Sequence, residues 1–242
     1  MSLLTSAIKK ALWNAGYSLQ PRQIQATEDN TMEGGLQRLH ALGIQPHTII
    51  DIGAAQGTWT MKALKYWPKA KYELLEPLLE QKEILAALKN TYPSITHHLA
   101  VAGKEAGTVQ LNVSDDLDGS GIYQEKSANS REVPVITLDE IATGREAPFL
   151  VKFDTHGYEI PILEGAVNML QQTNALIIEV YGFKISPTCL LFHELSDYLL
   201  RAGFRLVDIV DIMRRPGDNA FWQADAIYLR KEESLFRKNR YA

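Results

Sequence analysis

Short apolar runs alternate with stretches of helical spacing along most of this chain, and this alternation limits the possible folds more than any other feature. Predicted strands lie at 47–53, 71–77, 95–103, 149–154 and 175–182, and predicted helices at 57–67, 78–90 and 159–171. Strands that are separated by helices pair in parallel, and the helices cover both faces of the sheet. We therefore predict an α/β fold with a Rossmann-like, mostly parallel sheet.

The rest of the chain does not follow this alternation of strands and helices. Further strands are predicted at 107–114, 131–141, 204–210 and 225–230, and a helix at 188–202. Between the first two of these strands, residues 114–129 are rich in Asp, Gly and Ser, which indicates a loop. With Gly119 and Gly121 as hinges this loop is expected either to close over a bound molecule or to be a surface excursion. The last two strands flank a Pro-Gly turn, which favours an antiparallel pair.

Helical spacing at 2–15 and 31–41 precedes the first predicted strand. We therefore divide the chain into an N-terminal helical extension, residues 1–45, and a main domain, residues 46–242. The extension is expected either to cap the binding pocket or to mediate a homodimer.

Composition excludes several classes of function. The chain has 25 Lys and Arg against 29 Asp and Glu, a net charge of −4, which argues against nucleic acid as the main partner. The single cysteine, Cys189, cannot form an internal disulfide and is expected to be a buried apolar residue in a cytoplasmic protein. No apolar run reaches the ~18 residues needed to span a bilayer, and the opening residues do not resemble a signal peptide, so we expect no stable membrane insertion.

The first strand ends in a short motif that indicates a nucleoside site. Asp51, Gly53 and Gly57 form the pattern D-x-G-x-x-x-G between a strand and a helix, with Ala54 and Gln56 inside the turn. Gly53 permits a tight turn and a close backbone approach, and Gly57 lets the next helix pack near the strand. A carboxylate at this place repels phosphate and attracts a cation. The motif therefore favours S-adenosylmethionine, which carries an ammonium and a sulfonium, over NAD.

The second strand ends at Glu76 and Pro77. A carboxylate at that position can accept hydrogen bonds from both ribose hydroxyls of a nucleoside. Alone, Glu76 is equally well explained as a solvated strand-end carboxylate. Together with the turn after the first strand, it favours a cofactor site.

The stretch VKFDTHGYEIPILEGA, residues 151–166, holds the candidate catalytic groups. Asp154 follows another parallel strand and is expected to face the same crevice as Asp51 and Glu76. His156 lies in the following turn, where an imidazole can take a proton from an acceptor hydroxyl or make a structural hydrogen bond. Glu159 is expected to stabilise the first turn of the next helix rather than to act in catalysis.

Lys152 lies in an otherwise apolar strand and needs a partner, for which Glu179 is the candidate if the two strands are neighbours. Tyr181, just after Glu179, is expected either to line the acceptor pocket or to cover the end of the sheet. Asp154, His156 and Glu179 together could hold a divalent ion, but three hard ligands are a sparse set, and we predict no metal from the sequence.

These motifs resemble the FkbM family of S-adenosylmethionine-dependent methyltransferases. The resemblance covers about residues 46–230 and rests on IIDIGAAQGTWT, LLEP, VITLDEI and FLVKFDTHGYEIPILEGA in this order. The chain has Ala55 where the family usually has Asn, and His156 where Glu or Gln is frequent. The family implies a seven-stranded class I methyltransferase fold and O-methylation of hydroxyls on sugars, polyketides or other small metabolites.

The predicted reaction is thus methyl transfer from S-adenosylmethionine to a small-molecule or glycan acceptor. The predicted cofactor-binding residues are Asp51, Gly53, Ala54, Gln56, Gly57, Glu76, Pro77, Val101 and Asp154. The predicted catalytic residues are His156 and Asp154, and the predicted acceptor contacts are Tyr158, Glu179 and Tyr181. The alternatives are a non-catalytic nucleoside-binding module, an N-methyltransferase and an NAD-dependent oxidoreductase, of which the last is weakened by the missing GxGxxG motif.

Overall fold

The computed structural model describes residues 30–117, 119–122, 129–238 and 240. The predicted helix at 2–15 and a part of the predicted loop at 114–129 lie outside these residues. Within them, no helix has both the length and the apolar content that crossing a bilayer requires.

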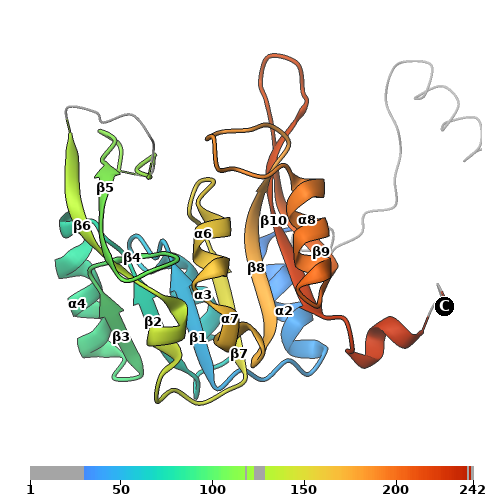
Figure 1. The fold of residues 1–242 in the computed structure, drawn as a ribbon. Coiled ribbons are helices and arrows are strands. Elements are labelled where there is room, and N and C mark those ends of the chain that lie inside the picture. The colour runs from blue at the N-terminus through green and yellow to red at the C-terminus, as the bar shows by residue number, and fades with distance from the viewer. Residues whose placement is uncertain (1–29, 118, 123–128, 239, 241–242) are drawn as a thin grey trace, which may run out of the picture.

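A seven-stranded sheet forms the centre of the molecule, in the order β3-β2-β1-β7-β8-β10-β9 (Figure 1). Its strands are β1 (Thr48–Ile52), β2 (Lys71–Leu75), β3 (Ile95–His98), β7 (Phe149–Phe153), β8 (Thr173–Tyr181), β9 (Phe204–Arg214) and β10 (Phe221–Arg230). All neighbours pair in parallel except β10, which is antiparallel to both β8 and β9. The predicted sheet is confirmed, as is the antiparallel pair at the end of the chain.

Helices cover both faces of this sheet (Figure 1). One face carries α2 (Met32–Ala41), α3 (Thr58–Leu64) and α4 (Lys82–Thr91). The short helix η1 (Leu79–Gln81) directly precedes α4 in the chain. The other face carries α5 (Leu138–Ala142), α6 (Glu159–Glu164), α7 (Val167–Leu170) and α8 (Phe192–Arg201), and a short helix η2 (Ser234–Arg237) follows β10.

Alternation along each strand assigns its side chains to these two layers. In β1, Ile50 and Ile52 pack under α5 to α8, whereas Ile49 packs under α2 to α4. Asp51 shares the face of Ile49 because side chains alternate with a period of two. The same rule places Lys152 of β7, the neighbour of Asp51 in the sheet, on that face.

A second, three-stranded sheet lies beside the first, in the order β4-β6-β5 (Figure 1). Its strands are β4 (Val101–Ala102), β5 (Gly107–Asn112) and β6 (Ser130–Ile136). The predicted strand 95–103 was therefore wrong as a single element, since its two halves join different sheets. The predicted strand 131–141 ends at Ile136, because Thr137 and Glu140 form a capping box that starts α5.

The predicted helix 159–171 is divided into α6 and α7 at Gly165 and Ala166. A Cβ on Gly165 would lie 2.1 Å from the carbonyl oxygen of Gly103. The backbone just after β4 therefore packs directly against the break between the two helices.

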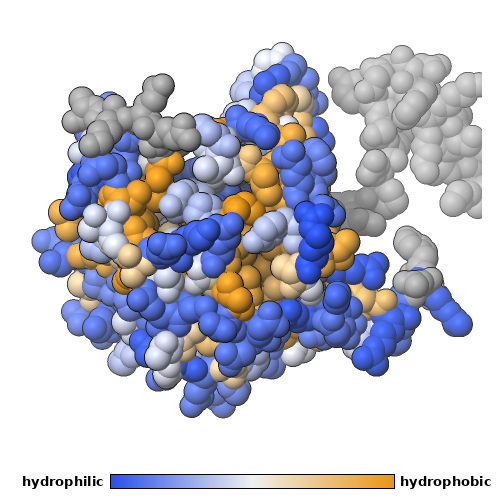
Figure 2. Space-filling view, viewed as in Figure 1, coloured by the Kyte–Doolittle hydropathy of each residue, from blue (hydrophilic) through white to orange (hydrophobic). Residues whose placement is uncertain are grey.

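The order of the strands locates the crevice for a ligand. From β1 the chain builds the sheet outward through β2 and β3, and then returns to add β7 and β8 on the other side of β1. Ligands of such sheets bind beyond the carboxyl ends of the strands at this switch point. The surface is hollowed there, between the small sheet and the β8–β10 side, and hydrophobic residues are exposed in the walls (Figure 2).

Candidate active site

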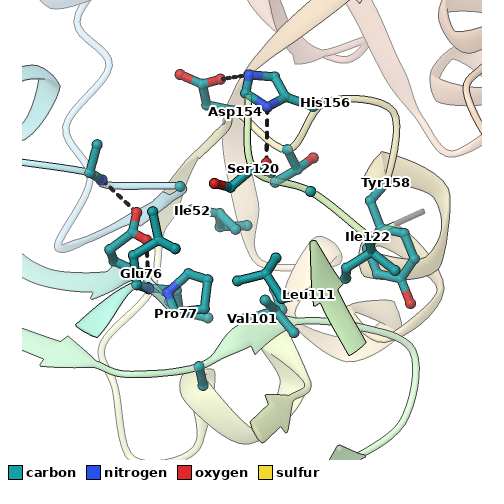
Figure 3. A pocket seen from close by; sticks show the side chains of 18 of the residues that line it. Ile52, Glu76, Pro77, Val101, Leu111, Ser120, Ile122, Asp154, His156 and Tyr158 are labelled. Carbon is teal, nitrogen blue, oxygen red and sulfur yellow. Dashed lines mark hydrogen bonds and ion pairs between the residues drawn. The ribbon is translucent and has the colours of Figure 1, made fainter. Parts of the chain in front are cut away.

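A cavity of about 200 Å³ opens at the carboxyl ends of β1, β2 and β7 (Figure 3). Seven predicted site residues line it: Gly53, Glu76, Pro77, Val101, Asp154, His156 and Tyr158. Its apolar wall comes from η1 and from the small sheet, where Leu78, Val101 and Leu111 belong to one buried cluster. The small sheet therefore contributes one side of the cavity.

The turn after β1 is held close to the turn after β7. Asp154 donates its backbone N–H to the carbonyl of Ile52 at 3.1 Å. Gly53 has a φ of +72°, and a Cβ on it would lie 2.1 Å from the carbonyl oxygen of Asp154. Both the backbone conformation and the space require glycine. The predicted tight turn is present, and the group that approaches it is the backbone of Asp154.

Ala55 of this turn also lines the cavity, but the other predicted residues of the turn do not. Gly57, at the start of α3, is buried, and a Cβ there would lie 2.4 Å from a methyl group of Leu88 in α4. Its role is to let α3 and α4 pack. Gln56 is exposed, and Ala54 lines an adjoining cavity.

Glu76 is fixed at the floor of the cavity by its own loop and by the turn after β1 (Figure 3). Its Oε2 accepts the backbone N–H of Ala55 at 2.8 Å, and its Oε1 accepts that of Leu78 at 2.9 Å. The residue is only 4% exposed. Burial raises the pKa of Glu76, although both backbone N–H groups act in the opposite direction. Each oxygen keeps a lone pair for a further donor.

Asp51 lies behind the cavity instead of lining it, which corrects the prediction of a direct ligand contact. It is fully buried, and its Oδ2 accepts a hydrogen bond from the Thr60 hydroxyl of α3 at 2.6 Å. Its Oδ1 has no hydrogen-bond partner within the described part of the chain and lies 3.7 Å from Nζ of Lys152. Burial raises the pKa of Asp51 above its ordinary value. Asp51 thus fastens α3 to the sheet.

Lys152 pairs with Asp154 and not with Glu179, so the predicted pair was wrong. Its Nζ donates to Oδ2 of Asp154 at 2.8 Å. The register explains this, because Lys152 lies level with Ile177 on β8 and Glu179 lies two residues further along. Burial alone would lower the pKa of Lys152, but the carboxylates of Asp154 and Asp51 raise it above its usual range. Lys152 therefore stays charged beneath the cavity.

His156 lies at the rim of the cavity (Figure 3) and has a φ of +50°. Its Nδ1 donates to the carbonyl oxygen of Ser120 at 3.3 Å. Its Nε2 lies 3.4 Å from Oδ1 of Asp154 and 3.9 Å from Oε2 of Glu179. The two predicted catalytic residues are thus in contact, and Glu179 lies beside them.

Glu179 is 8% exposed and is held by two side chains of the same sheet. Tyr181 donates its hydroxyl to Oε2, and Gln223 of β10 donates its amide N–H to Oε1. Burial and the charge of Asp154 raise the pKa of Glu179. Glu179 and Tyr181 do not line the cavity, but Glu179 reaches its rim through His156.

Glu159 has the structural role that the sequence predicted. It begins α6 and is 3% exposed. Its Oε1 accepts the backbone N–H of Gly157 at 2.9 Å and the hydroxyl of Thr155 at 3.0 Å. These bonds fix the turn that carries His156.

A second cavity of about 220 Å³ adjoins the first and shares Gly53, Ala55 and Asp154 with it. Asp211 of β9 and Asp225 of β10 also line it. Sequence reasoning missed these two and Gln223, although Gln223 and Asp225 alternate with apolar residues in an otherwise buried strand. It also missed Ser120 and Ile122, which come from the described part of the 114–129 loop and line the first cavity.

Comparison with known proteins identifies the family of this chain. Residues 51–206 of the 242 match the family described as Methyltransferase FkbM domain. The chain belongs to the FkbM methyltransferase family. The match begins at Asp51 and includes the turns at the ends of β1, β2 and β7 that build the cavity. The family that the sequence motifs predicted is thus confirmed.

The individual proteins that resemble this chain share little sequence identity with it. The Hexuronic acid methyltransferase AglP of Haloferax volcanii is 29% identical over 68 residues, which are 27% of this chain and 28% of that protein. The match spans little more than a quarter of the relative.

Among solved structures, the fibrillarin pre-rRNA processing protein of Methanococcus jannaschii is 15% identical, with a TM-score of 0.49 and coverage of 84% of this chain and 76% of that one. The Burkholderia thailandensis 1,6-didemethyltoxoflavin-N1-methyltransferase, solved with S-adenosylhomocysteine, is 12% identical, with a TM-score of 0.45 and coverage of 94% and 87%.

Proposed function

We propose that this FkbM methyltransferase transfers a methyl group from S-adenosylmethionine to a hydroxyl of a small molecule or a sugar-containing metabolite. The observation that carries the proposal is the carboxylate of Glu76, which two backbone N–H groups fix in an apolar cavity beside the Gly53 turn. A cavity with one anchored anionic acceptor and apolar walls suits a nucleoside better than a phosphate.

The residues of the cavity fit this cofactor. Glu76 keeps lone pairs that can accept from two ribose hydroxyls. Leu78, Val101 and Leu111 offer an apolar wall for a purine ring. Asp154 adds negative charge near the Gly53 turn, where a cationic group of the ligand is favoured. When bound, S-adenosylmethionine supplies an electrophilic methyl group on a positively charged sulfur.

The acceptor side of the site favours a hydroxyl over an amine. An alcohol oxygen must lose a proton that it holds tightly, whereas a neutral amine attacks without help. His156, Asp154 and Glu179 stand together at the rim and are suited to handling that proton. The partial similarity to a protein named for hexuronic acid methylation supports a sugar-acid acceptor.

Two measurements test this function. Isothermal titration should show binding of S-adenosylmethionine and S-adenosylhomocysteine and none of NAD. Transfer of a labelled methyl group should then be screened on monosaccharides, uronic acids and matched amino sugars, with mass spectrometry to locate the methyl. Binding of NAD alone would reject a methyltransferase site. Labelling on nitrogen only would favour the N-methyltransferase, and cofactor binding without transfer to any acceptor would favour a non-catalytic module.

A further inference from the structure

Asp154, His156 and Glu179 direct one atom each to a single point at the cavity rim. In the part of the chain that the structure describes, their ligand atoms all lie within 4.8 Å of one another. The nearest pair, Nε2 of His156 and Oδ1 of Asp154, is 3.4 Å apart. Donor atoms around an ion with bonds of about 2.1 Å lie about 3 to 4 Å from one another. The three atoms therefore stand close to the arrangement that a small divalent ion requires.

Each of the three side chains is also oriented by a hydrogen bond through its other polar atom. Lys152 donates to the second oxygen of Asp154, and Gln223 donates to the second oxygen of Glu179. His156 donates its other ring nitrogen to a backbone carbonyl. Residues that bind metals are typically oriented by such outer hydrogen bonds, because these fix both the tautomer and the direction of the free lone pair.

The bond to Ser120 determines what His156 presents to its neighbours. A carbonyl oxygen only accepts hydrogen bonds, so Nδ1 carries the proton. In the neutral ring Nε2 then has a lone pair, and this lone pair faces the carboxylates of Asp154 and Glu179. These three electron-rich atoms lie within 4.8 Å of one another, and Oε2 of Glu179 also accepts the hydroxyl of Tyr181. A cation at their meeting point would offset the repulsion among them.

Acidic groups are numerous around this point. The carboxyl groups of Asp51, Asp154, Glu179 and Asp225 lie along one face of the sheet, with the ammonium of Lys152 among them. A bound cation would offset this excess of acidic groups.

We propose that Asp154, His156 and Glu179 bind a divalent first-row transition-metal ion, and that this ion binds two adjacent oxygens of the methyl acceptor. One imidazole nitrogen and two carboxylate oxygens suit Mn²⁺, Co²⁺ or Zn²⁺ and leave positions open toward the cavity. The matching acceptors are vicinal diols and hydroxy acids. The role in catalysis rests on the proposed function, whereas binding of the ion does not.

The ion lowers the pKa of a hydroxyl that it binds. That hydroxyl gives its proton to solvent water, and its oxygen then forms the bond to the methyl carbon. The bond between this carbon and sulfur breaks and leaves its electron pair on sulfur. His156 and Asp154 thus assist removal of the proton as ligands.

Titration of the full chain with Mn²⁺, after removal of metals with a chelator, tests the site directly. Electron paramagnetic resonance measures the free Mn²⁺ that remains. We expect uptake of one ion, competition by Zn²⁺, and affinity reduced about tenfold or more in both Glu179→Gln and His156→Gln. Glu164→Gln is the matched control, since Glu164 is an exposed carboxylate paired with Lys104, and it should bind Mn²⁺ as the native chain does.

Titration of every variant with S-adenosylhomocysteine separates this proposal from the proposed function. Retained binding shows that a variant is folded and that its cofactor cavity is intact. The metal site is overturned if the native chain takes up no Mn²⁺, if both site variants bind it as Glu164→Gln does, or if transfer continues at full rate in protein shown to be metal-free. Mn²⁺ uptake without binding of S-adenosylmethionine or S-adenosylhomocysteine would instead reject the proposed function and leave the metal site standing.

Discussion

The carbonyl oxygen of Asp154 occupies the space that a Cβ on Gly53 would need, at a distance of 2.1 Å. The two turns that border both cavities therefore touch at a point where the chain has no side chain. A residue of the predicted cofactor motif and a predicted catalytic residue hold each other in place, so a change in one turn moves the other.

Replacing Gly53 with Ala should destabilise the fold and weaken S-adenosylhomocysteine binding together. A left-handed conformation costs a non-glycine residue about 1–2 kcal/mol, and the contact with Asp154 adds to this cost. Gly43 is the matched control, because it has a φ of +82° with nothing within 4 Å of an added Cβ. Urea unfolding should show a clearly larger loss for Gly53→Ala than for Gly43→Ala. Equal losses would mean that the backbone at Asp154 moves away from the added Cβ without a cost in stability.

Glu76→Gln should reduce the affinity for S-adenosylhomocysteine about tenfold to a hundredfold. The change leaves an amide nitrogen facing the backbone N–H of Ala55 or Leu78, and hydrogen bonds to a charged group contribute about 1.5–3 kcal/mol each. Glu80→Gln is the control, since its carboxylate is exposed and pairs with Arg131. Isothermal titration of both variants measures the effect. An unchanged affinity in Glu76→Gln would remove the main support for the cofactor site.

The sequence predicted the sheet, the positions of its helices and the strand ends that build the cavity, because these follow from local alternation. It did not predict the direction of Asp51, whose side chain points under α3 rather than into the cavity. Nor did it predict that Val101 pairs with Val135, since this pairing joins segments that are distant in the chain. The contact of Gln223 with Glu179 depends on a register that shifts along β10, and no local pattern specifies it.

Thr60→Val should cost about 1–3 kcal/mol in the free energy of unfolding. Valine has nearly the shape of threonine but leaves Oδ2 of the buried Asp51 without its donor. Thr60→Ser keeps the hydroxyl that donates to Asp51 and should therefore lower the free energy of unfolding much less. Urea unfolding of the two variants measures the difference. If valine and serine were equally tolerated, Asp51 would not be fastening α3.

Glu73 should make the fold sensitive to acid. Its carboxylate is bonded to His98 at 2.8 Å and to Arg145. Burial alone would raise the pKa of Glu73, but His98 and Arg145 lower it below its ordinary value of 4.5. The stability from this group is complete above pH 4.5 and is lost as the pH falls through the lower pKa of the folded state. Urea unfolding at several pH values should show a shallower acid dependence in Glu73→Gln. Parallel curves for the two proteins would contradict this role.

His156→Ala should leave S-adenosylhomocysteine affinity within about threefold of the native value and lower kcat about a hundredfold or more. The reason is geometric, because the imidazole faces Asp154 and Glu179 at the rim, whereas Glu76 anchors the nucleoside on the floor. His193→Ala, on the exposed side of α8, is the matched control and should leave both quantities unchanged. Isothermal titration and a labelled-methyl assay on an accepted substrate separate binding from turnover. Unchanged kcat in His156→Ala would assign this residue to holding the turn, through its bond to Ser120, and would move the search for the proton-handling group to Asp154 and Glu179.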